Sequence, residues 1–366
     1  MKYDFLIVGA GFAGSVLAER IASQLDKSVL LIDKRAHFGG NAYDEPDDHG
    51  ILVHRYGPHL FHTNDKAVFQ YLSQFTQWRP YEHRALAAVD GKLVPIPINR
   101  RTVNELFGLS LSTDEEVRDF FKSELEPRKE ILNSEDVVVS KVGRRLYEKL
   151  YRGYTRKQWG LDPTDLAPSV CGRLPVRTSL DDRYFDDVYQ AIPLLGYTEM
   201  FRKMLSHPKI DVLLQTDFRS IKLDQYQRLI FTARIDEYFE YMHGVLPYRS
   251  LRFEFETHEQ EFSQPVAVIN YTKSESFTRV TEFKHITGQF HQKTTIAKEY
   301  SLDSGEPYYP IPRPENAEMY RRYEAEAARA KKVLFTGRLA TYRYYNMDQV
   351  VAQSLALFKR IAEGKV

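Results

Sequence analysis

The chain has 366 residues, of which 43% are hydrophobic and 13% aromatic, and its formal net charge at pH 7 is +1. A chain of this length and apolar content is typical of a globular protein with two or three packed units and a sizeable core. The nearly balanced charge excludes a global basic field that would attract nucleic acid or an acidic membrane, so we expect any anion site to be local.

The cysteine content favours a reducing compartment, and the hydropathy argues against a membrane span. The single cysteine, Cys171, excludes an internal disulfide and a cysteine-based metal cluster. No hydrophobic run approaches the length of a membrane-spanning helix. We therefore expect a cytoplasmic protein that does not insert into a membrane and does not bind nucleic acid.

A dinucleotide-binding βαβ unit is the first predicted structure in the chain. The apolar run at residues 5–8 has strand character and leads into a glycine motif at residues 9–14. An amphipathic stretch with helical spacing follows at 16–25, and a second apolar run, 29–32, ends at Asp33. This order of strand, glycine loop, helix, strand and acid is typical of a Rossmann unit.

Each glycine of the motif has a predicted physical role. Gly9 allows the tight turn, Gly11 lets the backbone approach a pyrophosphate, and Gly14 lets the helix pack closely on the strand. The pyrophosphate would bind the free N–H groups at the helix N-terminus. Asp33 can bind a ribose hydroxyl, which favours NAD or FAD over NADP. The glycine pair and asparagine at residues 39–41 favour FAD.

The rest of the chain alternates between helical and strand patterns. In chain order, the pattern predicts a glycine-proline loop with two histidines at 56–63, a helix capped by Asn64 or Asp65, and a hairpin at 85–98 that turns at Asp90-Gly91. A helical region follows at 101–159, with a capping box at 113–116 and a helical stripe of Val142, Leu146 and Leu150. Strands are predicted at 210–235, where they are expected to rejoin the dinucleotide sheet, and at 248–256, 266–271, 279–283 and 295–300. The last predicted elements are a helix at 316–330, a strand at 333–336 and a final helix capped by Asn346.

These elements predict an α/β fold. We expect a Rossmann-like FAD-binding domain with an inserted helical domain and an antiparallel β-sheet domain. The FAD-binding domain is predicted at residues 1–80, 200–245 and 325–366, the helical domain at 100–185, and the antiparallel sheet at 81–99 and 246–324. The two ends of the chain are thus expected to meet in one domain, with the middle inserted.

Three arginines stand where surface arginines are less expected. Arg177 ends the run at 173–177, Arg279 lies between apolar residues, and Arg249 falls on the apolar face of a strand with period-two alternation. A desolvated guanidinium needs an anion and matches phosphate oxygens bidentately. The same arginines can instead pair with carboxylates in a structural network, and the residue pattern leaves both interpretations open.

Aromatic residues accompany these arginines in the sequence. Rings that can stack a base or donate to phosphate oxygens are Tyr154, Trp159, Tyr184, Tyr189, Tyr308, Tyr309 and Tyr344. Each of these rings can equally belong to the core. With the arginines they favour a nucleotide-diphosphate substrate beside the flavin.

Two histidines in the loop at 56–63 invite a metal or a cofactor interpretation. His59 and His62 lack the helical spacing of a metal pair and no third ligand is evident, so we expect no metal. A loop histidine in contact with the cofactor is consistent with the glycine-proline context. The sequence contains no second GxGxxG motif, which argues against a permanently bound nicotinamide cofactor.

Over nearly its full length the chain resembles the bacterial UDP-galactopyranose mutases. The matching blocks are VGAGFAG with GGN, YGPHLFHT, RGYTRKQWG, RLPVR followed by Tyr184-Phe185, YRSLRFE, AVINY, TRVTEFKH, PYYPIP and GRLATYRYYNMDQV. The resemblance implies a flavoenzyme that interconverts UDP-galactopyranose and UDP-galactofuranose. In that family the reduced FAD acts as a nucleophile on the anomeric carbon, UDP leaves and returns, and no net redox change occurs.

The resemblance also implies partners and a mobile segment. The flavin needs an external reductant, and a homodimer stays an open alternative. The helical domain would carry the uridine site and a mobile lid around Arg177.

Site residues follow from the matching blocks. The resemblance implies catalytic roles for Arg177, Arg279 and His62, the two arginines holding the departing diphosphate. It implies substrate contacts for His83, Tyr154, Thr155, Trp159, Tyr184, Tyr189, Arg249, Asn270, Tyr309 and Tyr344. It implies cofactor contacts for Gly9, Gly11, Phe12, Gly14, Asp33, Lys34, Gly40, Asn41, His59, Phe218, Arg338, Asn346 and Met347.

Two positions depart from the family pattern. Relatives carry Thr-Gly-Pro where this chain has Thr232-Ala233-Arg234, so the turn loses two residues with special backbone conformations and gains a charge. Asn346 stands where several relatives carry Asp, which removes a charge near the flavin but keeps the capping ability.

Other functions stay open beside the mutase. One is a related mutase on another sugar nucleotide, such as UDP-N-acetylgalactosamine. A flavin oxidase of the amine-oxidase type would share the FAD unit but needs no diphosphate clamp. A third alternative is a nucleotide-binding module without chemistry.

Overall fold

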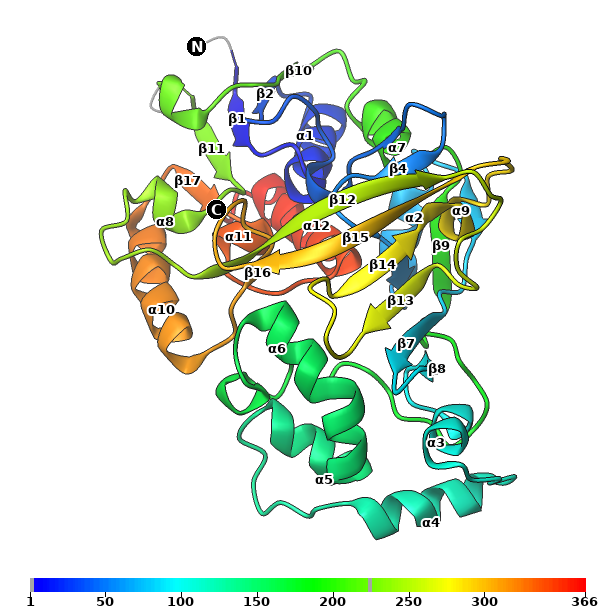
Figure 1. Ribbon diagram of the computed structural model, residues 1–366. Coiled ribbons are helices and arrows are strands. Elements are labelled where there is room, and N and C mark those ends of the chain that lie inside the picture. The colour runs from blue at the N-terminus through cyan, green and yellow to red at the C-terminus, as the bar shows by residue number, and fades with distance from the viewer. Residues whose placement is uncertain (1–2, 223–225) are drawn as a thin grey trace.

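The computed structural model describes residues 3–222 and 226–366 (Figure 1). The predicted ranges 1–80, 200–245 and 210–235 therefore include residues that lie outside the described ones. The elements form two main sheets and a group of helices, and the boundaries of the three predicted domains stay predictions.

A five-stranded parallel sheet forms the first layer, with strand order β10-β2-β1-β11-β17. Its strands are β1 (Phe5–Val8), β2 (Val29–Ile32), β10 (Ile210–Leu213), β11 (Arg228–Phe231) and β17 (Val333–Phe335). Helix α1 (Phe12–Leu25) packs against α12 (Met347–Ala362), which comes from the other end of the sequence. The predicted return of later strands to the dinucleotide sheet is confirmed.

A seven-stranded sheet crosses the middle of Figure 1, with strand order β16-β12-β15-β14-β13-β7-β8. Its strands are β7 (Ala85–Val89), β8 (Lys92–Ile96), β12 (Tyr248–His258), β13 (Val268–Tyr271), β14 (Arg279–Glu282), β15 (Thr294–Leu302) and β16 (Tyr309–Pro310). The hairpin predicted around Asp90-Gly91 is the pair β7–β8. Neighbouring strands are antiparallel except β13 and β7, which run parallel.

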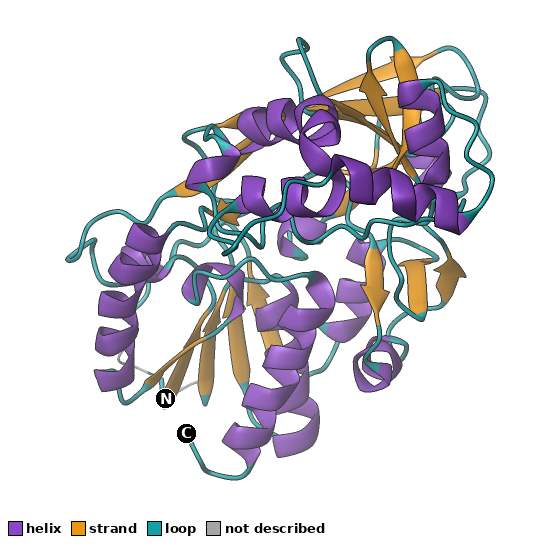
Figure 2. Cartoon of the chain, turned by 90° about the horizontal axis from the view of Figure 1, so that it is seen from below, coloured by secondary structure: helices purple, strands orange, loops and turns teal. Residues whose placement is uncertain are grey.

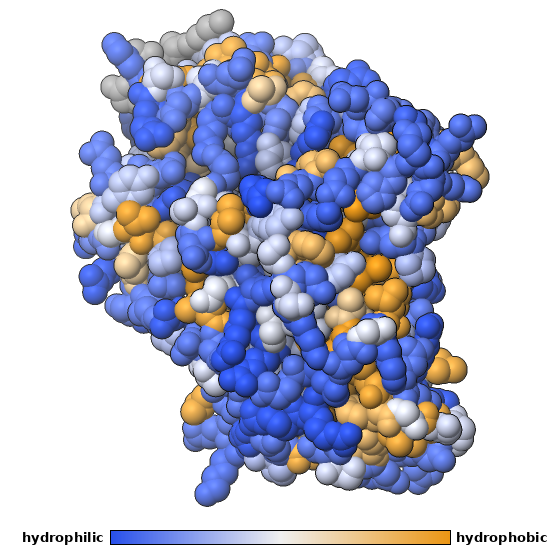
Figure 3. Space-filling model, in the orientation of Figure 1, coloured by the Kyte–Doolittle hydropathy of each residue, from blue (hydrophilic) through white to orange (hydrophobic). Residues whose placement is uncertain are grey.

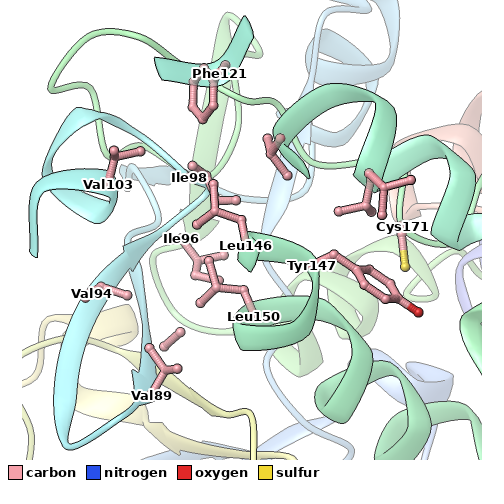
Figure 4. Packing of buried hydrophobic residues seen from close by; sticks show 14 of the residues in the cluster. Val89, Val94, Ile96, Ile98, Val103, Phe121, Leu146, Tyr147, Leu150 and Cys171 are labelled. Atoms are coloured by element: carbon pink, nitrogen blue, oxygen red, sulfur yellow. The ribbon is translucent and has the colours of Figure 1, made fainter. Parts of the chain in front are cut away.

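Helices α3–α6 occupy the lower end of Figure 1. They are α3 (Arg100–Phe107), α4 (Asp114–Glu124), α5 (Ser134–Leu146) and α6 (Gly153–Trp159), and a π-helical turn at Tyr147–Arg152 joins α5 to α6. The predicted stripe of Val142, Leu146 and Leu150 is buried (Figure 4). It packs against the β7–β8 hairpin, so the hairpin and the helices share one hydrophobic core.

Smaller elements connect these layers. They are β3 (Asp44–Pro46), β4 (Leu52–His54), β5 (Phe61–Thr63), α2 (Lys66–Leu72), β6 (Trp78–Pro80), β9 (Tyr189–Pro193), α7 (Tyr197–Met204), α8 (Ile235–Tyr238), α9 (Phe283–Thr287), α10 (Pro314–Arg329) and α11 (Gly337–Ala340). The short sheet β5-β9-β6 was not predicted. Asp65, Thr113 with Glu116, and Asn346 with Gln349 cap the helices α2, α4 and α12, as expected.

The arrangement of helices against the parallel sheet is clearest in Figure 2. Hydrophilic side chains cover most of the face in Figure 3, with apolar groups scattered between them. Within the described residues, every helix is too short or too polar to cross a bilayer.

A buried carboxylate ties the loop after β12 to the C-terminal end of β14, in the interior of the seven-stranded sheet. Glu282 is fully buried and accepts hydrogen bonds from the backbone N–H groups of Ser263 (2.8 Å) and Gln264 (2.9 Å). It also accepts from the Thr294 hydroxyl at 2.6 Å and lies 3.3 Å from His285 Nε2. Burial raises the pKa of Glu282, but the hydrogen bonds from these partners outweigh burial and leave its pKa lowered.

Gly14→Ala is expected to destabilise the protein, because a Cβ at Gly14 would lie 1.9 Å from the Gly9 carbonyl oxygen. Such overpacking of backbone against backbone costs about 1–3 kcal/mol of unfolding free energy. Gly11→Ala is the matched control, since its Cβ would lie 3.6 Å from the nearest atom, Gly40 Cα. Urea unfolding followed by circular dichroism measures both, and equal stabilities would contradict the predicted packing role of Gly14.

Glu282→Gln is expected to lower the unfolding free energy at pH 7 and to weaken its acid dependence. Because the folded pKa of Glu282 is lowered, its contribution is complete above the unfolded pKa of about 4.3 and disappears as pH falls through the folded pKa. The difference between wild type and variant is therefore largest near neutral pH and shrinks toward pH ~3. Urea unfolding across this pH range tests it, and a pH-independent difference would rule out the charge as the cause.

Candidate active site

The first cavity surrounds the predicted dinucleotide motif. Its lining includes the predicted cofactor residues Gly9, Gly11, Phe12, Asp33, Lys34, Gly40, Asn41, His59, Phe218, Arg338 and Met347. We call it the dinucleotide cavity. Gly14 lies beneath it, where it allows α1 to approach β1, and Asn346 lines a neighbouring cavity instead.

The glycine loop has the shape that a pyrophosphate needs. Gly9 has φ +99° and a Cβ there would collide with Thr232 Oγ1 at 2.1 Å, so only glycine fits. Gly11 is the N-cap of α1 and supplies no side-chain cap, which leaves the first N–H groups of the helix available. A Cβ at Gly11 would project toward Gly40, on the opposite side of the loop.

Asp33 connects the glycine loop to the end of β2. One carboxylate oxygen accepts from the Ala10 N–H at 2.8 Å and the other from the Arg35 N–H at 2.9 Å. Each oxygen keeps a second lone pair toward the cavity that Asp33 lines. Asp33 can therefore orient the glycine loop and bind a ribose hydroxyl at the same time.

An ion-pair group closes one side of the dinucleotide cavity. Lys34 Nζ lies 3.0 Å and Arg35 Nη2 3.5 Å from the carboxylate of Glu306, which precedes β16. Arg35 also donates to Asn41 Oδ1 at 2.9 Å and lies over the Tyr56 ring at 4.3 Å. The sequence indicated Lys34 here but gave no signal for Glu306.

The family departure at 232–234 is accommodated without strain. Arg234 has φ −63°, which is the value that proline would fix, and its ψ of 123° is extended. Its guanidinium pairs with the buried Asp236 and lies 4.9 Å from the Tyr248 ring centroid. The extra charge is therefore neutralised locally by Asp236.

The second cavity has a volume of about 620 Å³ and is lined by the π-helical turn and α6, by strands β13–β15, by the first turn of α12 and by loops between these elements. We call it the aromatic cavity. Trp159, Tyr309 and Tyr344 contact one another there, with ring centroids 5.1–6.1 Å apart. Its volume falls in the range of small-molecule sites, about 300–1,000 Å³. Asn41, His59, Tyr308, Arg338 and Met347 line both cavities, so the two are continuous.

Ten predicted substrate or catalytic residues come together in the aromatic cavity. They are His62, His83, Tyr154, Thr155, Trp159, Tyr184, Asn270, Arg279, Tyr309 and Tyr344. Their elements are far apart in sequence, so the fold has assembled them.

One rung of the seven-stranded sheet supplies the polar centre of this cavity. Asn270, Arg279 and Glu299 are register partners on β13, β14 and β15. Arg279 Nε lies 3.1 Å from Glu299 Oε1, and Thr278 donates to the same oxygen at 3.0 Å. Burial disfavours the charge on Arg279, but Glu299 and nearby tyrosines outweigh it and leave the pKa of Arg279 raised, so the cation persists.

Two groups of this rung have unused hydrogen-bonding capacity. Within the described residues, Asn270 Oδ1 and Arg279 Nε are buried without a hydrogen-bond partner, although Nε keeps its ion pair with Glu299. Buried polar groups without partners are rare in folded proteins. A polar ligand in the cavity would satisfy them.

A second cation in the cavity is Arg173, which the sequence interpretation missed. Its Nη2 donates to Asn346 Oδ1 at 2.6 Å, and its guanidinium lies 4.2 Å from the Tyr344 ring centroid. Tyr184 lies near both Arg173 and Arg279. Arg173 and Arg177 belong to the same block, RLPVR, and the motif alone does not tell which arginine faces the cavity.

Three predicted residues are corrected, because they lie outside the cavity lining in the described chain. Arg177 donates to the Arg183 carbonyl and pairs with Asp186. Tyr189 stacks on Phe69, with centroids 4.3 Å apart.

Arg249 is the third correction. It donates to the Gln158 carbonyl (3.1 Å) and to Ser301 Oγ (2.9 Å) and pairs with Asp303. It is therefore a buried structural residue that holds the C-terminal end of α6, including Trp159, against β12 and β15.

The three histidines of the aromatic cavity differ in environment. Burial lowers the pKa of His59 and of His83 to about 3, so both are neutral at pH 7. Their Nδ1 atoms contact the Gly57 carbonyl (2.9 Å) and the Tyr81 hydroxyl (3.0 Å). His62 instead has a carboxylate partner, Asp187, 2.7 Å from its Nδ1.

Sequence reasoning also missed several other lining residues. They are Tyr151, Gln158, Cys171, Phe185, Asp186, Asp187, Glu299 and Asp348. Tyr151 sits beside the predicted helical stripe and Asp348 inside a matched block, so a signal was available for both. Asp187 and Glu299 carry no motif or periodicity that would identify them.

Comparisons with known proteins agree with this geometry. A family model described as UDP-galactopyranose mutase matches residues 149–344, and one described as an NAD(P)-binding Rossmann-like domain matches residues 7–75. A probable UDP-galactopyranose mutase of Klebsiella pneumoniae is 38% identical over 364 residues, covering 96% of this chain and 93% of the relative. A dTDP-fucopyranose mutase of Escherichia coli is 35% identical over 362 residues, covering 96% of each chain.

The fold is also similar to that of a solved mutase structure. A crystal structure of reduced UDP-galactopyranose mutase superposes with a TM-score of 0.81 at 16% identity, covering 99% of this chain and 94% of that one. Sequence and family model thus agree over most of the length. The chain belongs to the UDP-galactopyranose mutase family.

Proposed function

We propose that the protein is a flavin-dependent mutase that interconverts UDP-galactopyranose and UDP-galactofuranose. The observation that carries the proposal is the aromatic cavity, whose lining includes the guanidinium groups of Arg173 and Arg279 and which shares lining residues with the dinucleotide cavity. A flavin oxidase needs no such pair of cations beside its flavin.

FAD fits the residues of the dinucleotide cavity. Gly9 and Gly11 leave room for a pyrophosphate at the N-terminus of α1, and Asp33 offers oxygens to a ribose. The isoalloxazine would lie where the cavities meet, between His59, Arg338 and Met347. When bound and reduced, FAD supplies the nucleophile for the anomeric carbon, and the protein must hold the sugar over it.

The two arginines suit a diphosphate leaving group. Guanidinium groups bind phosphate oxygens bidentately, and fixed cations stabilise the charge that develops as the C1–O bond breaks. Arg279 is held by Glu299, and Arg173 by the neutral amide of Asn346. A neutral partner leaves the charge of Arg173 uncompensated by that contact and available to the substrate.

The nucleoside would occupy the α6 end of the cavity. Tyr154 and Trp159 offer ring faces, and Thr155 is buried with its hydroxyl 3.5 Å from Cys171 Sγ. Asn270, with its unpaired oxygen, supplies a further polar contact.

A second sugar nucleotide is a specific alternative, because the E. coli relative is named a dTDP-fucopyranose mutase. The two nucleotides differ at the base, at the 2′ position of the pentose and at C6 of the sugar. The general assignment as a sugar-nucleotide mutase does not depend on this choice.

A substrate panel is the direct test. The purified protein is loaded with FAD, reduced with dithionite under anaerobic conditions and incubated with UDP-galactose, UDP-N-acetylgalactosamine or dTDP-fucose. Chromatography is expected to show the furanose form of UDP-galactose without consumption of reductant. Conversion of dTDP-fucose alone would reassign the substrate, and stoichiometric oxidation of a small amine would show an oxidase.

Arg279→Ala and Arg173→Ala are expected to weaken UDP binding. Each removes a charge-assisted contact worth about 1.5–3 kcal/mol, which corresponds to roughly tenfold to a hundredfold in Kd. Arg177→Ala is the matched comparison and is expected to leave UDP affinity within about threefold, because Arg177 does not line the cavity and its charge is paired with Asp186.

Isothermal titration with UDP gives the affinities, and flavin absorbance confirms that each variant still binds FAD. If Arg177→Ala lost affinity while Arg173→Ala kept it, the assignment of the second cation would be wrong.

A further inference from the structure

His62 and Asp187 form a pair on one wall of the aromatic cavity, outside the cofactor and diphosphate contacts described above. His62 Nδ1 lies 2.7 Å from one oxygen of Asp187, and Asn64 Nδ2 donates to the other oxygen at 2.7 Å. Both residues line the cavity. The carboxylate is therefore fixed at both oxygens, and it fixes one ring nitrogen of His62 in turn.

The surroundings hold this pair rigidly. The Phe185 ring stacks on the His62 ring, with centroids 3.6 Å apart and planes 12° apart. Gln190 Nε2 donates to the Asp187 carbonyl at 2.9 Å, and the Val188 N–H donates to Asn64 Oδ1 at 2.9 Å. Among the described residues, the other ring nitrogen, Nε2, has no hydrogen-bond partner.

The arrangement is that of an oriented acid–base histidine. A carboxylate on Nδ1 places the proton there, stabilises the imidazolium form and leaves Nε2 to exchange a proton with a ligand. His59 and His83 lack a carboxylate partner among the described contacts, and burial keeps both neutral. His62 is thus the histidine of this cavity that has an orienting carboxylate.

Other titratable groups face His62 from the neighbouring elements. His83 follows β6 and is neutral, Asp186 precedes Asp187, and Asp348 lies in the first turn of α12, where it accepts from the Thr63 hydroxyl at 3.0 Å. The carboxylates oppose loss of the imidazolium charge, and Arg279, which lies near His83, favours it.

Ring contraction requires a proton to change place on the sugar. In the pyranose-to-furanose direction the C1–O5 bond breaks, its electron pair stays on O5, and O5 takes up a proton. The C1–O4 bond then forms with a lone pair of O4, and O4 releases its proton. The sugar neither gains nor loses a proton overall, so one group can give the first proton and recover the second.

We propose that His62, oriented by Asp187, is this group. The inference rests on the proposed mutase function. His62 enters as imidazolium, donates from Nε2 to O5 as the pyranose opens, and accepts the O4 proton as the furanose closes, which restores the imidazolium. Asp187 is a positioning residue that keeps the Nδ1 proton in place throughout.

Asp187→Asn tests the pair, because it keeps the shape and removes the charge. General acid–base catalysis contributes about 10²–10⁴-fold, so His62→Gln is expected to lower kcat at least about a hundredfold and Asp187→Asn about tenfold or more. KM and UDP affinity should stay within about twofold in Asp187→Asn, since the diphosphate and nucleoside contacts are unchanged. Asp182→Asn is the matched control, an exposed acid of the same segment that pairs with Arg84.

The pH dependence separates positioning from structure. The kcat of the wild type and of both variants is measured across pH, and the profile of Asp187→Asn is expected to differ from that of the wild type, because the carboxylate beside the imidazole loses its charge. Asp182→Asn should keep the wild-type profile. Histidine side-chain NMR of the FAD-loaded protein without substrate provides an independent readout: Asp187→Asn should release the fixed tautomer of His62.

Each outcome is informative. If the wild type isomerises no sugar nucleotide, the mutase function and this inference both fail. If the wild type is active and Asp187→Asn keeps its kcat and pH profile, only the inference fails. Where Asp187→Asn does not fold, Asn64→Ala keeps both members of the pair and frees one carboxylate oxygen. An unchanged His62 tautomer and an unchanged kcat in that variant would overturn the positioning role.

Discussion

A guanidinium held inside a protein needs an anion beside it, and the pairing of Arg279 with Glu299 across adjacent strands meets this requirement. The Glu299 side chain is 3% exposed and also accepts from Thr278, so it cannot move far when a ligand arrives. The register of β14 and β15 thus sets the direction of the cation. Folding therefore orients the Arg279 guanidinium before a ligand binds, which is the condition for electrostatic preorganisation.

The ends of the strands explain why the two cavities lie side by side. Parallel strands place their following loops at one edge of a sheet, and the loops after β1, β2 and β11 surround the dinucleotide cavity. The seven-stranded sheet approaches this edge through β16, which brings Tyr308 and Tyr309 beside Arg338. A cofactor held at the edge of one sheet would therefore meet a substrate held by the other, at the residues that line both cavities.

The sequence predicted those parts of the structure that depend on local physics. Gly9 and Gly14 have steric requirements that any chain with this turn must meet, and the period-two pattern correctly placed Arg249 on a buried face. Periodicity says which face a side chain joins but not which partner it finds. Ser301 and Asp303 lie more than fifty positions from Arg249, and only the β12–β15 register brings them together. For the same reason the motif did not distinguish Arg173 from Arg177.

Strand geometry also explains why His62, and not a neighbour, meets Asp187. Successive side chains of β5 point to opposite faces, and Phe61 and Thr63 are buried on the side of α2 and α12. His62 must then face the aromatic cavity, where β9 delivers the segment that contains Asp187. A slip of one residue between β5 and β9 would turn the imidazole into the core and a phenyl ring into the cavity. The buried position of Phe61 therefore fixes the direction of the His62 side chain. The proposed acid–base role of His62 depends in this way on the register of a three-residue strand.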